Sequence, residues 1–239
     1  MAAPASHRTI ILPHIIKYIP KNGKLGEEAN VYAFDLDHTI IRPKSGGRFS
    51  RGAEDWIFMS FSSNKEGESR KTVDTLAELL KSDTNAQVVI FSNQGGIVTI
   101  PPTSKSCANF TRKIDLVLQA VANLNLDLQD RIWLYASTKK PASLSSTKRP
   151  KTIKKVAKKN SQAQTAKDQS IFSDAIFQSM RKPNPGMFEE FTNDFGRKFK
   201  LEYYCGDAAG RKSDFSDSDK LFAAAIKTAF RTPEEVFSE

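Results

Sequence analysis

The sequence predicts an α/β fold built around a parallel sheet, because apolar runs of strand length alternate with amphipathic runs of helix length. The runs at 31–41, 87–93, 131–137 and 201–207 are rich in strand-forming residues. Strands that are separated by helices pair in parallel through right-handed crossovers. Ligands of such sheets bind at the carboxyl ends of the strands, so we expect the functional residues there.

The extended pattern begins near the N-terminus. Residues 9–19 (TIILPHIIKYI) predict an edge segment that is interrupted at Pro13, because proline cannot donate to a β-ladder. Residues 31–41 (VYAFDLDHTII) form an apolar run that ends in acids, which indicates a central parallel strand. Residues 55–61 (DWIFMSF) predict another short strand.

Helices and strands then alternate. The segments 69–83 and 106–124 repeat their apolar residues at helical spacing, which predicts two amphipathic helices. The strand 87–93 (QVVIFSN) lies between them, and the strand 131–137 (RIWLYAS) follows the second helix. This order predicts two successive crossovers within one sheet.

The C-terminal third continues the alternation. Helices are predicted over 171–181 and 186–199, with Pro183 and Pro185 breaking the chain between them. The fourth strand, 201–207 (LEYYCGD), follows the second of these helices.

A last helix is predicted over 216–229, which is rich in alanine. Ser216 followed by Asp219 resembles an N-terminal capping pattern. We therefore assign Asp217 and Asp219 to the start of this helix and not to a functional site.

The composition excludes several classes of protein. No apolar stretch approaches the ~20 residues of a membrane span, and the N-terminus lacks the basic region and cleavage site of a secretory signal. Two cysteines, Cys107 and Cys205, argue against a disulfide framework and fit a reducing compartment. With three histidines and no cysteine cluster, we expect no zinc site. We expect a single domain over 1–239.

One segment carries the excess positive charge. The net charge is +9, and residues 139–159 hold nine Lys and Arg and no acid, so the other 27 basic residues balance the 27 acids. Because 138–170 has almost no large apolar residue, we expect a solvated, flexible insertion there. It could attract a nucleic-acid backbone, act as a nuclear-import signal through KRPKTIKK, or aid solubility. We favour targeting or nonspecific attraction over any part in catalysis.

The motif FDLDHT at 34–39 suggests phosphoryl-transfer chemistry. Asp35, at a strand end, can attack phosphorus as a carboxylate nucleophile. Asp37 can protonate the departing oxygen and later deprotonate water. Because carboxylate and phosphate are both anionic, a hard divalent cation such as Mg²⁺ is needed to bring them together. The alternative is that this D-x-D sequence is only a turn that caps a helix.

Three further motifs supply the remaining groups. Ser92 and Asn93 follow a strand and precede two glycines, so a hydroxyl and backbone N–H groups can hold phosphate oxygens. Lys182 can neutralise charge on the transferring group. Asp207 is assigned as a metal ligand. Asp214 is assigned to contact the metal ligands without binding the metal itself. Taken alone, the motif at Ser92 is more typical of an ordinary loop, and Lys182 of a solvated surface lysine. The order of the motifs and their placement at strand ends together favour one site.

These motifs, taken in order, resemble a known family. D-x-D-x-T at 35–39, Ser92, Lys182 and Gly-Asp at 206–207 resemble the four motifs of the haloacid-dehalogenase-like phosphohydrolases, over roughly 31–237. FDLDHTII, DWIF, VIFSNQGG, RKP, YYCGDAAGRKSDFSDSDKLFA and TPEEVF are similar to the phosphatase domain of the polynucleotide kinase 3′-phosphatase family. The resemblance implies a three-layer Rossmann-like α/β fold with a small cap and an open cleft.

The resemblance also implies roles. Asp35 would be the nucleophile that becomes a phospho-aspartate, and Asp37 the acid and base, with its main-chain carbonyl on Mg²⁺. Asp35 and Asp207 would be the other protein ligands of the metal. The phosphoryl group and the loop beside it would be held by Thr39, Ser92, Asn93 and Lys182.

The implied substrate is a DNA end that bears a 3′-phosphate, acted on by a nuclear, monomeric repair enzyme. The G-x-x-x-x-G-K-[ST] loop of a kinase is absent, so we expect a phosphatase without a kinase domain. The stretch IVTIPPTSK after FSNQGG is less basic than the family pattern, so the DNA-contacting residues stay open. Arg42, Lys44, Arg48 and Lys105 are candidates, although a solvated surface charge is the simpler interpretation of each.

Two other functions are open at this stage. The same scaffold could hydrolyse small metabolites or phosphoproteins with the same residues. The chain could also be a DNA-end-binding module that has lost catalysis, although the intact acids, serine and lysine argue against this.

Overall fold

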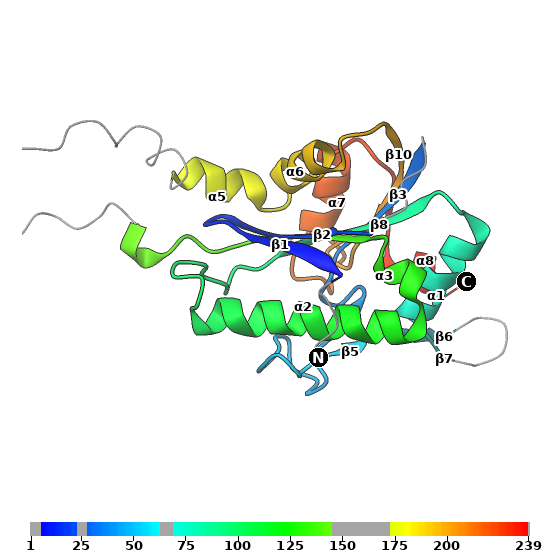
Figure 1. The fold of residues 1–239 in the computed structure, drawn as a ribbon, viewed down its shortest axis with the longest axis horizontal. Coiled ribbons are helices and arrows are strands. Elements are labelled where there is room, and N and C mark those ends of the chain that lie inside the picture. The colour runs from blue at the N-terminus through cyan, green and yellow to red at the C-terminus, as the bar shows by residue number, and fades with distance from the viewer. Residues whose placement is uncertain (1–5, 23–27, 63–68, 145–172, 239) are drawn as a thin grey trace, which may run out of the picture.

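The computed structural model describes residues 6–22, 28–62, 69–144 and 173–238. A central sheet has helices on both faces (Figure 1). In chain order its strands are β1 (His7–Ile11), β2 (Ile15–Pro20), β3 (Ala29–Phe34), β8 (Ala86–Asn93), β9 (Ile132–Ser137), β10 (Phe199–Cys205) and β11 (Phe230–Arg231). The helices are α1 (Thr72–Ser82), α2 (Lys105–Leu124), α3 (Leu126–Gln129), α5 (Asp174–Met180), α6 (Gly186–Phe195), α7 (Ser218–Ala225), α8 (Pro233–Phe237) and the short 3₁₀ helix η1 (Ala142–Leu144).

The sheet confirms the predicted parallel core. Its spatial order is β1-β2-β9-β8-β3-β10-β11, and every pairing from β9 across to β11 is parallel. The N-terminal segment folds back near Pro13, so β1 and β2 form an antiparallel hairpin, and β2 pairs antiparallel with β9. The ends of β3, β8 and β10 therefore lie beside one another at one edge.

Each face of the sheet is covered by its own apolar cluster, which confirms the three-layer fold. Along β8, Val88 and Ile90 pack with α1, α2 and α8, while Val89 and Phe91 pack with α6 and α7. This alternation follows from the period of two along a strand. Figure 1 shows α1, α2, α3 and α8 on one side of the sheet and α5, α6 and α7 on the other. No helix in the described ranges is long and apolar enough to cross a membrane.

Several elements are shorter than predicted. Among them are the helices expected over 69–83 and 216–229, which are α1 (Thr72–Ser82) and α7 (Ser218–Ala225). The helix expected over 186–199 ends at Phe195, because Gly196 adopts a left-handed conformation (φ 64°) and closes the last turn. The strand expected over 31–41 ends at Phe34, where the chain leaves the sheet into the loop that carries Asp35 and Asp37.

The residues after this loop form small hairpins outside the main sheet. Their strands are β4 (Ile41–Arg42), β5 (Ile57–Phe58), β6 (Ser60–Ser62) and β7 (Ser69–Lys71). β4 pairs with β5, and β6 with β7, so the strand predicted over 55–61 is divided between two hairpins. The small cap that the resemblance implies stays a prediction. Of the predicted insertion, 138–144 is described and ends in η1, and 145–170 lies outside the described residues.

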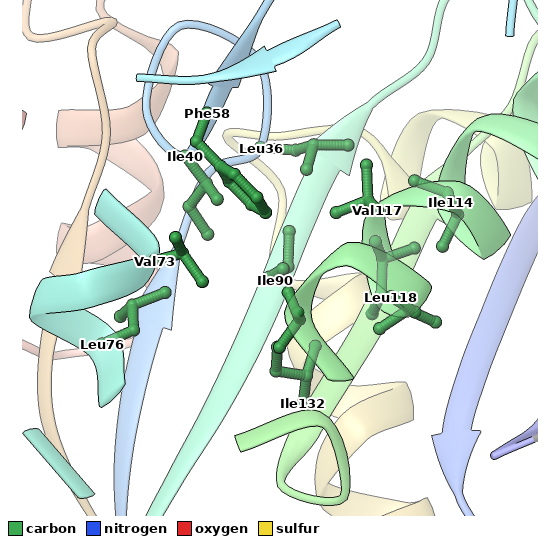
Figure 2. A pocket seen from close by; sticks show the side chains of 12 residues that line it. Leu36, Ile40, Phe58, Val73, Leu76, Ile90, Ile114, Val117, Leu118 and Ile132 are labelled. Atoms are coloured by element: carbon green, nitrogen blue, oxygen red, sulfur yellow. The ribbon is translucent and has the colours of Figure 1, made fainter. Parts of the chain in front are cut away.

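Leu36 anchors the loop between the two acids in the core. Its side chain is fully buried and lines an apolar cavity of about 20 Å³ between the sheet, α1 and α2 (Figure 2). Ile90, Ile114 and Val117 are among the other residues that line it, and every lining residue is apolar. A cavity of this size and lining is a packing gap and not a ligand site. The anchored Leu36 leaves its two acidic neighbours little freedom to move.

Candidate active site

The carboxyl edge of the sheet brings the predicted acids together from distant parts of the chain. Asp35 follows β3 and Asp207 follows β10, and these strands are paired, with Phe34 opposite Cys205. The backbone N–H of Asp35 donates to the Cys205 carbonyl at 2.8 Å. Ser92 lies at the end of β8, on the other side of β3. The strand-end placement expected from the sequence is therefore confirmed.

Lys182 is the cationic centre of the site. It lies in the loop between α5 and α6 and is only 4% exposed. Its Nζ atom donates to Asp35 Oδ1 at 2.6 Å, to the Tyr204 hydroxyl at 2.7 Å and to Asp219 Oδ1 at 2.8 Å. Three oxygen partners satisfy the three donors of the ammonium group, so this side chain is held in one place.

Asp219 lies in the first turn of α7, where the sequence placed it, but its carboxylate belongs to this site and does not cap the helix. The N-cap residue of α7 is Asp217, which makes no side-chain capping bond. Asp219 is 2% exposed; besides Lys182, its carboxylate accepts from the Tyr204 hydroxyl at 2.8 Å and from the Ala208 N–H at 3.0 Å. Because Gly206 has no side chain, the Asp219 carboxylate in the first turn of α7 can point into the site instead of toward the end of the helix.

Gly206 explains how this approach is possible. A Cβ atom at this position would lie 2.4 Å from Asp219 Oδ2, closer than real Cβ contacts come. The Gly-Asp pair is therefore needed because the acid from α7 passes directly over the glycine. A glycine before a strand-end acid indicates a close approach at that point, but it does not identify Asp219 as the group that approaches.

Three carboxylates converge at this edge. Asp35, Asp207 and Asp219 each offer an oxygen, and these atoms lie within 4.8 Å of one another. A set made only of carboxylate oxygens suits a hard cation such as Mg²⁺. The side chain of Asp219 thus joins the two acids that the sequence assigned to the metal, while the side chain of Asp37 points elsewhere.

The electrostatics of the cluster favour an added cation. Burial raises the pKa of Asp35 well above its usual value, and the carboxylates of Asp219, Asp207 and Asp37 raise it further, against the opposing ammonium of Lys182. Burial and Asp219 raise the pKa of Asp207 to about 6. Burial alone would lower the pKa of Lys182, but Asp219 and Asp35 raise it overall, so the lysine stays charged. One ammonium cannot balance three converging carboxylates, two of which are buried, and the residues present fit a divalent metal.

Asp37 is held by two residues that were not identified from the sequence. Its Oδ2 accepts from Gln94 Nε2 at 2.6 Å, and its Oδ1 lies 3.5 Å from Lys113 Nζ. The same Gln94 amide donates to the Ser92 hydroxyl at 2.8 Å, which links Asp37 to Ser92. The available signals were the adjacency of Gln94 to FSN and a lysine on the apolar face of the helix at 106–124.

Asn93 contacts the protein itself, whereas the buried Thr39 hydroxyl makes no hydrogen bond among the described residues. The Asn93 side chain accepts from the Lys182 backbone N–H at 2.9 Å and donates to the Lys182 carbonyl at 3.0 Å, while Ser137 Oγ donates to Asn93 Oδ1 at 3.1 Å. Asn93 therefore positions Lys182, although it was predicted to contact substrate. Thr39 is fully buried, and its hydroxyl has no partner among the described residues.

Asp214 shapes the loop that follows Asp207. Its carboxylate accepts from the backbone N–H groups of Ala209 at 3.1 Å and Arg211 at 3.0 Å, and it pairs with the Arg211 guanidinium at 3.0 Å. Arg211 in turn donates to the Asp207 carbonyl at 3.2 Å. Asp214 thus acts on Asp207 through the loop backbone and does not join the three converging carboxylates.

The four surface cations considered from the sequence are exposed, as the simpler interpretation expects: they are Arg42, Lys44, Arg48 and Lys105. The Arg48 guanidinium lies over the Phe215 ring at 4.5 Å, so it joins the loop after Asp37 to the loop before α7. The free cysteines Cys107 and Cys205 are both buried.

Comparison with known proteins gives one consistent result. The family model described as polynucleotide kinase 3 phosphatase matches residues 30–237. The chain is 42% identical to the polynucleotide 3′-phosphatase of Saccharomyces cerevisiae, over 97% of this chain and 99% of that protein. It is 33% identical to the bifunctional polynucleotide phosphatase/kinase of Schizosaccharomyces pombe, over 92% of this chain and 40% of that protein. Among solved structures, a protein from Mesorhizobium loti described as a "putative HAD-like phosphatase" aligns with a TM-score of 0.48 and 14% identity, over 93% of this chain and 78% of that one.

Proposed function

This chain belongs to the polynucleotide kinase 3 phosphatase family, and from that premise we propose that it removes the phosphate from the 3′ ends of DNA strands. The product is a 3′-hydroxyl, which a polymerase or a ligase requires during break repair. We place this activity in the nucleus, on a single phosphatase domain that acts as a monomer. The observation that carries the proposal is the contact of the buried Lys182 with Asp35 and Asp219, beside Asp207.

The first step uses Asp35 as the nucleophile. Its carboxylate oxygen forms a bond to phosphorus while the bond from phosphorus to the 3′-oxygen breaks, and Asp37 gives its proton to that oxygen. Lys182, 2.6 Å from Asp35 Oδ1, opposes part of the rise in the pKa of Asp35 and neutralises charge on the transferring group. Ser92 supplies a hydroxyl for a phosphate oxygen.

The second step restores the enzyme. Asp37 takes a proton from water, the water oxygen bonds to phosphorus, and the bond to Asp35 breaks to release phosphate. Asp35, Asp207 and Asp219 would hold a magnesium ion, with the Asp37 carbonyl, and the ion would supply positive charge to the phosphate oxygens.

The substrate assignment is tested by comparing three phosphate esters. We expect kcat/KM for a 3′-phosphorylated oligonucleotide to exceed that for a matched 5′-phosphorylated one by at least ~100-fold, a difference of about 2.7 kcal/mol. A sugar phosphate should be as poor as the 5′-phosphate. Equal or better turnover of the sugar phosphate would support a metabolite phosphatase instead. No phosphate release with Mg²⁺ present, and no change on adding EDTA, would support a binding module without catalysis.

The metal site is tested through stability. We expect Mg²⁺ at 100 times its dissociation constant to stabilise the folded chain by about 2.7 kcal/mol, because it binds only the folded state. The measurement is the melting temperature with Mg²⁺ and with EDTA. Asp207→Asn should remove most of the Mg²⁺-dependent shift in melting temperature. The control Asp127→Asn changes an exposed acid on α3 and should leave that shift unchanged.

The pH dependence follows from the raised pKa of Asp207. In the metal-free folded chain, Asp207 keeps its proton up to about pH 6, whereas in the unfolded chain its pKa is the ordinary 3.8. Protonated Asp207 therefore contributes its full stabilisation below pH 3.8, and this contribution is lost as the pH rises through 6. A bound Mg²⁺ would have to displace the proton of Asp207, which is present at pH 5 and largely absent at pH 7.5. Stabilisation of the chain by Mg²⁺ should therefore be larger at pH 7.5 than at pH 5. An equal Mg²⁺ shift at both pH values would contradict a role for Asp207 as a ligand.

A further inference from the structure

Two donor side chains hold the acid/base group of the site, although neither belongs to the four sequence motifs. We propose that Lys113 and Gln94 are positioning residues that fix both oxygens of the Asp37 carboxylate for proton transfer to the leaving group. This inference rests on the proposed function, because it takes Asp37 as the acid. It assigns to these residues a specific effect on one chemical step.

Lys113 is buried in a position where a lysine is costly. It lies on the buried face of α2, beside Phe110 and Ile114, and is 6% exposed. Removing an ammonium group from water costs several kcal/mol unless a partner offsets it. Asp37, whose Oδ1 lies 3.5 Å from Nζ, is the carboxylate that the described residues provide for it. The lysine is therefore directed at Asp37 by the helix that carries it.

Gln94 approaches Asp37 from a different element. It directly follows β8, and its backbone N–H donates to the Ser137 carbonyl at 2.9 Å, which fixes its main chain. Its Nε2 donates both to Asp37 Oδ2 at 2.6 Å and to Ser92 Oγ at 2.8 Å. The Gln94 amide thus fixes the position of the Asp37 carboxylate relative to the Ser92 hydroxyl, which is proposed to contact the phosphate.

The two donors together restrict the rotation of the Asp37 side chain. One oxygen is held from α2 and the other from the end of β8, while the preceding residue, Leu36, is buried in the core. A general acid works only within hydrogen-bond reach of the atom that it protonates, and small misplacements are costly. Losing either donor should therefore weaken proton donation without removing the nucleophile or the metal ligands.

The test uses the chemistry of the leaving group. A good leaving group such as p-nitrophenolate departs without a proton, whereas a poor one needs the acid. We expect Lys113→Met to lower kcat/KM about tenfold for aryl phosphates with poor leaving groups and less than about threefold for p-nitrophenyl phosphate. The slope of log kcat/KM against leaving-group pKa should become steeper. Small esters are used so that lost attraction to DNA does not contribute.

Matched variants separate positioning from a general effect on the fold. Arg112→Met is the control, because Arg112 is the neighbouring residue of α2 and forms an exposed pair with Glu54. It should leave the slope unchanged. Gln94→Ala should steepen the slope as Lys113→Met does, and it tests the proposal independently if Lys113→Met folds poorly. In an Asp37→Ala background, Lys113→Met should have no further effect, because the two residues act through one group.

Two results would overturn the inference, and they are distinguishable from each other. If Lys113→Met and Gln94→Ala lower kcat/KM equally for all leaving groups, or add to Asp37→Ala, the two residues do not act through Asp37. If Asp37→Ala itself shows no dependence on the leaving group, the acid role in the proposed function is wrong, and the inference falls with it.

Discussion

Replacement of Asp35 by asparagine is expected to lower kcat by at least ~10⁴-fold, because an amide cannot form the proposed acyl phosphate with the substrate. Binding of a 3′-phosphorylated oligonucleotide should stay within a few-fold, since the Ser92 hydroxyl and the Lys182 ammonium remain. The measurements are single-turnover phosphate release and a binding titration. Acid-quenched wild-type protein should carry labelled phosphate from the substrate, and the variant should carry none.

A folding defect can be excluded in the same experiment. Burial and three neighbouring carboxylates raise the pKa of Asp35, so its negative charge is unfavourable in the metal-free folded state at neutral pH. We therefore expect Asp35→Asn to melt in EDTA at or above the temperature of the unchanged chain. Turnover near the wild-type rate in a folded variant would refute the covalent mechanism.

The second large effect is expected for Lys182→Met. Removing the ammonium leaves Asp35 and Asp219 buried without their cation, which should destabilise the metal-free protein by about 3–5 kcal/mol. The transferring phosphoryl group would also lose its cationic partner, and we expect kcat to fall by ~10²–10³-fold. Denaturant unfolding in EDTA and steady-state kinetics with Mg²⁺ measure the two effects separately.

A second substitution tests the cause of this instability. Adding Asp219→Asn to Lys182→Met removes one of the two unpaired carboxylates, so part of the lost stability should return while activity stays low. Lys200→Met is the matched control, because the ion pair of Lys200 with Glu202 lies at the surface and should contribute little. If Lys182→Met were no less stable than Lys200→Met, the charge balance described for the site would be incorrect.

Much of the architecture follows from local patterns in the chain. The four strands of the parallel core were predicted because each is a short apolar run, buried on both faces of the sheet. Element ends were harder to predict, since they depend on single backbone conformations such as the left-handed Gly196. The strand expected to continue through Asp35 ends at Phe34 because the loop after it closes on itself, with the N–H groups of Ile40 and Ile41 both donating to the Leu36 carbonyl.

The site divides in the same way. Asp35, Ser92 and Asp207 could be located from the chain alone, because a polar residue at or just after the carboxyl end of a buried parallel strand must lie at that edge of the sheet. Asp219, Gln94 and Lys113 could not, because an acid in a first helical turn, a glutamine in a loop and a lysine in a helix usually face water. Their roles depend on the packing of α7 over Gly206 and of α2 against the sheet, which bring donors and carboxylates together across long separations in sequence.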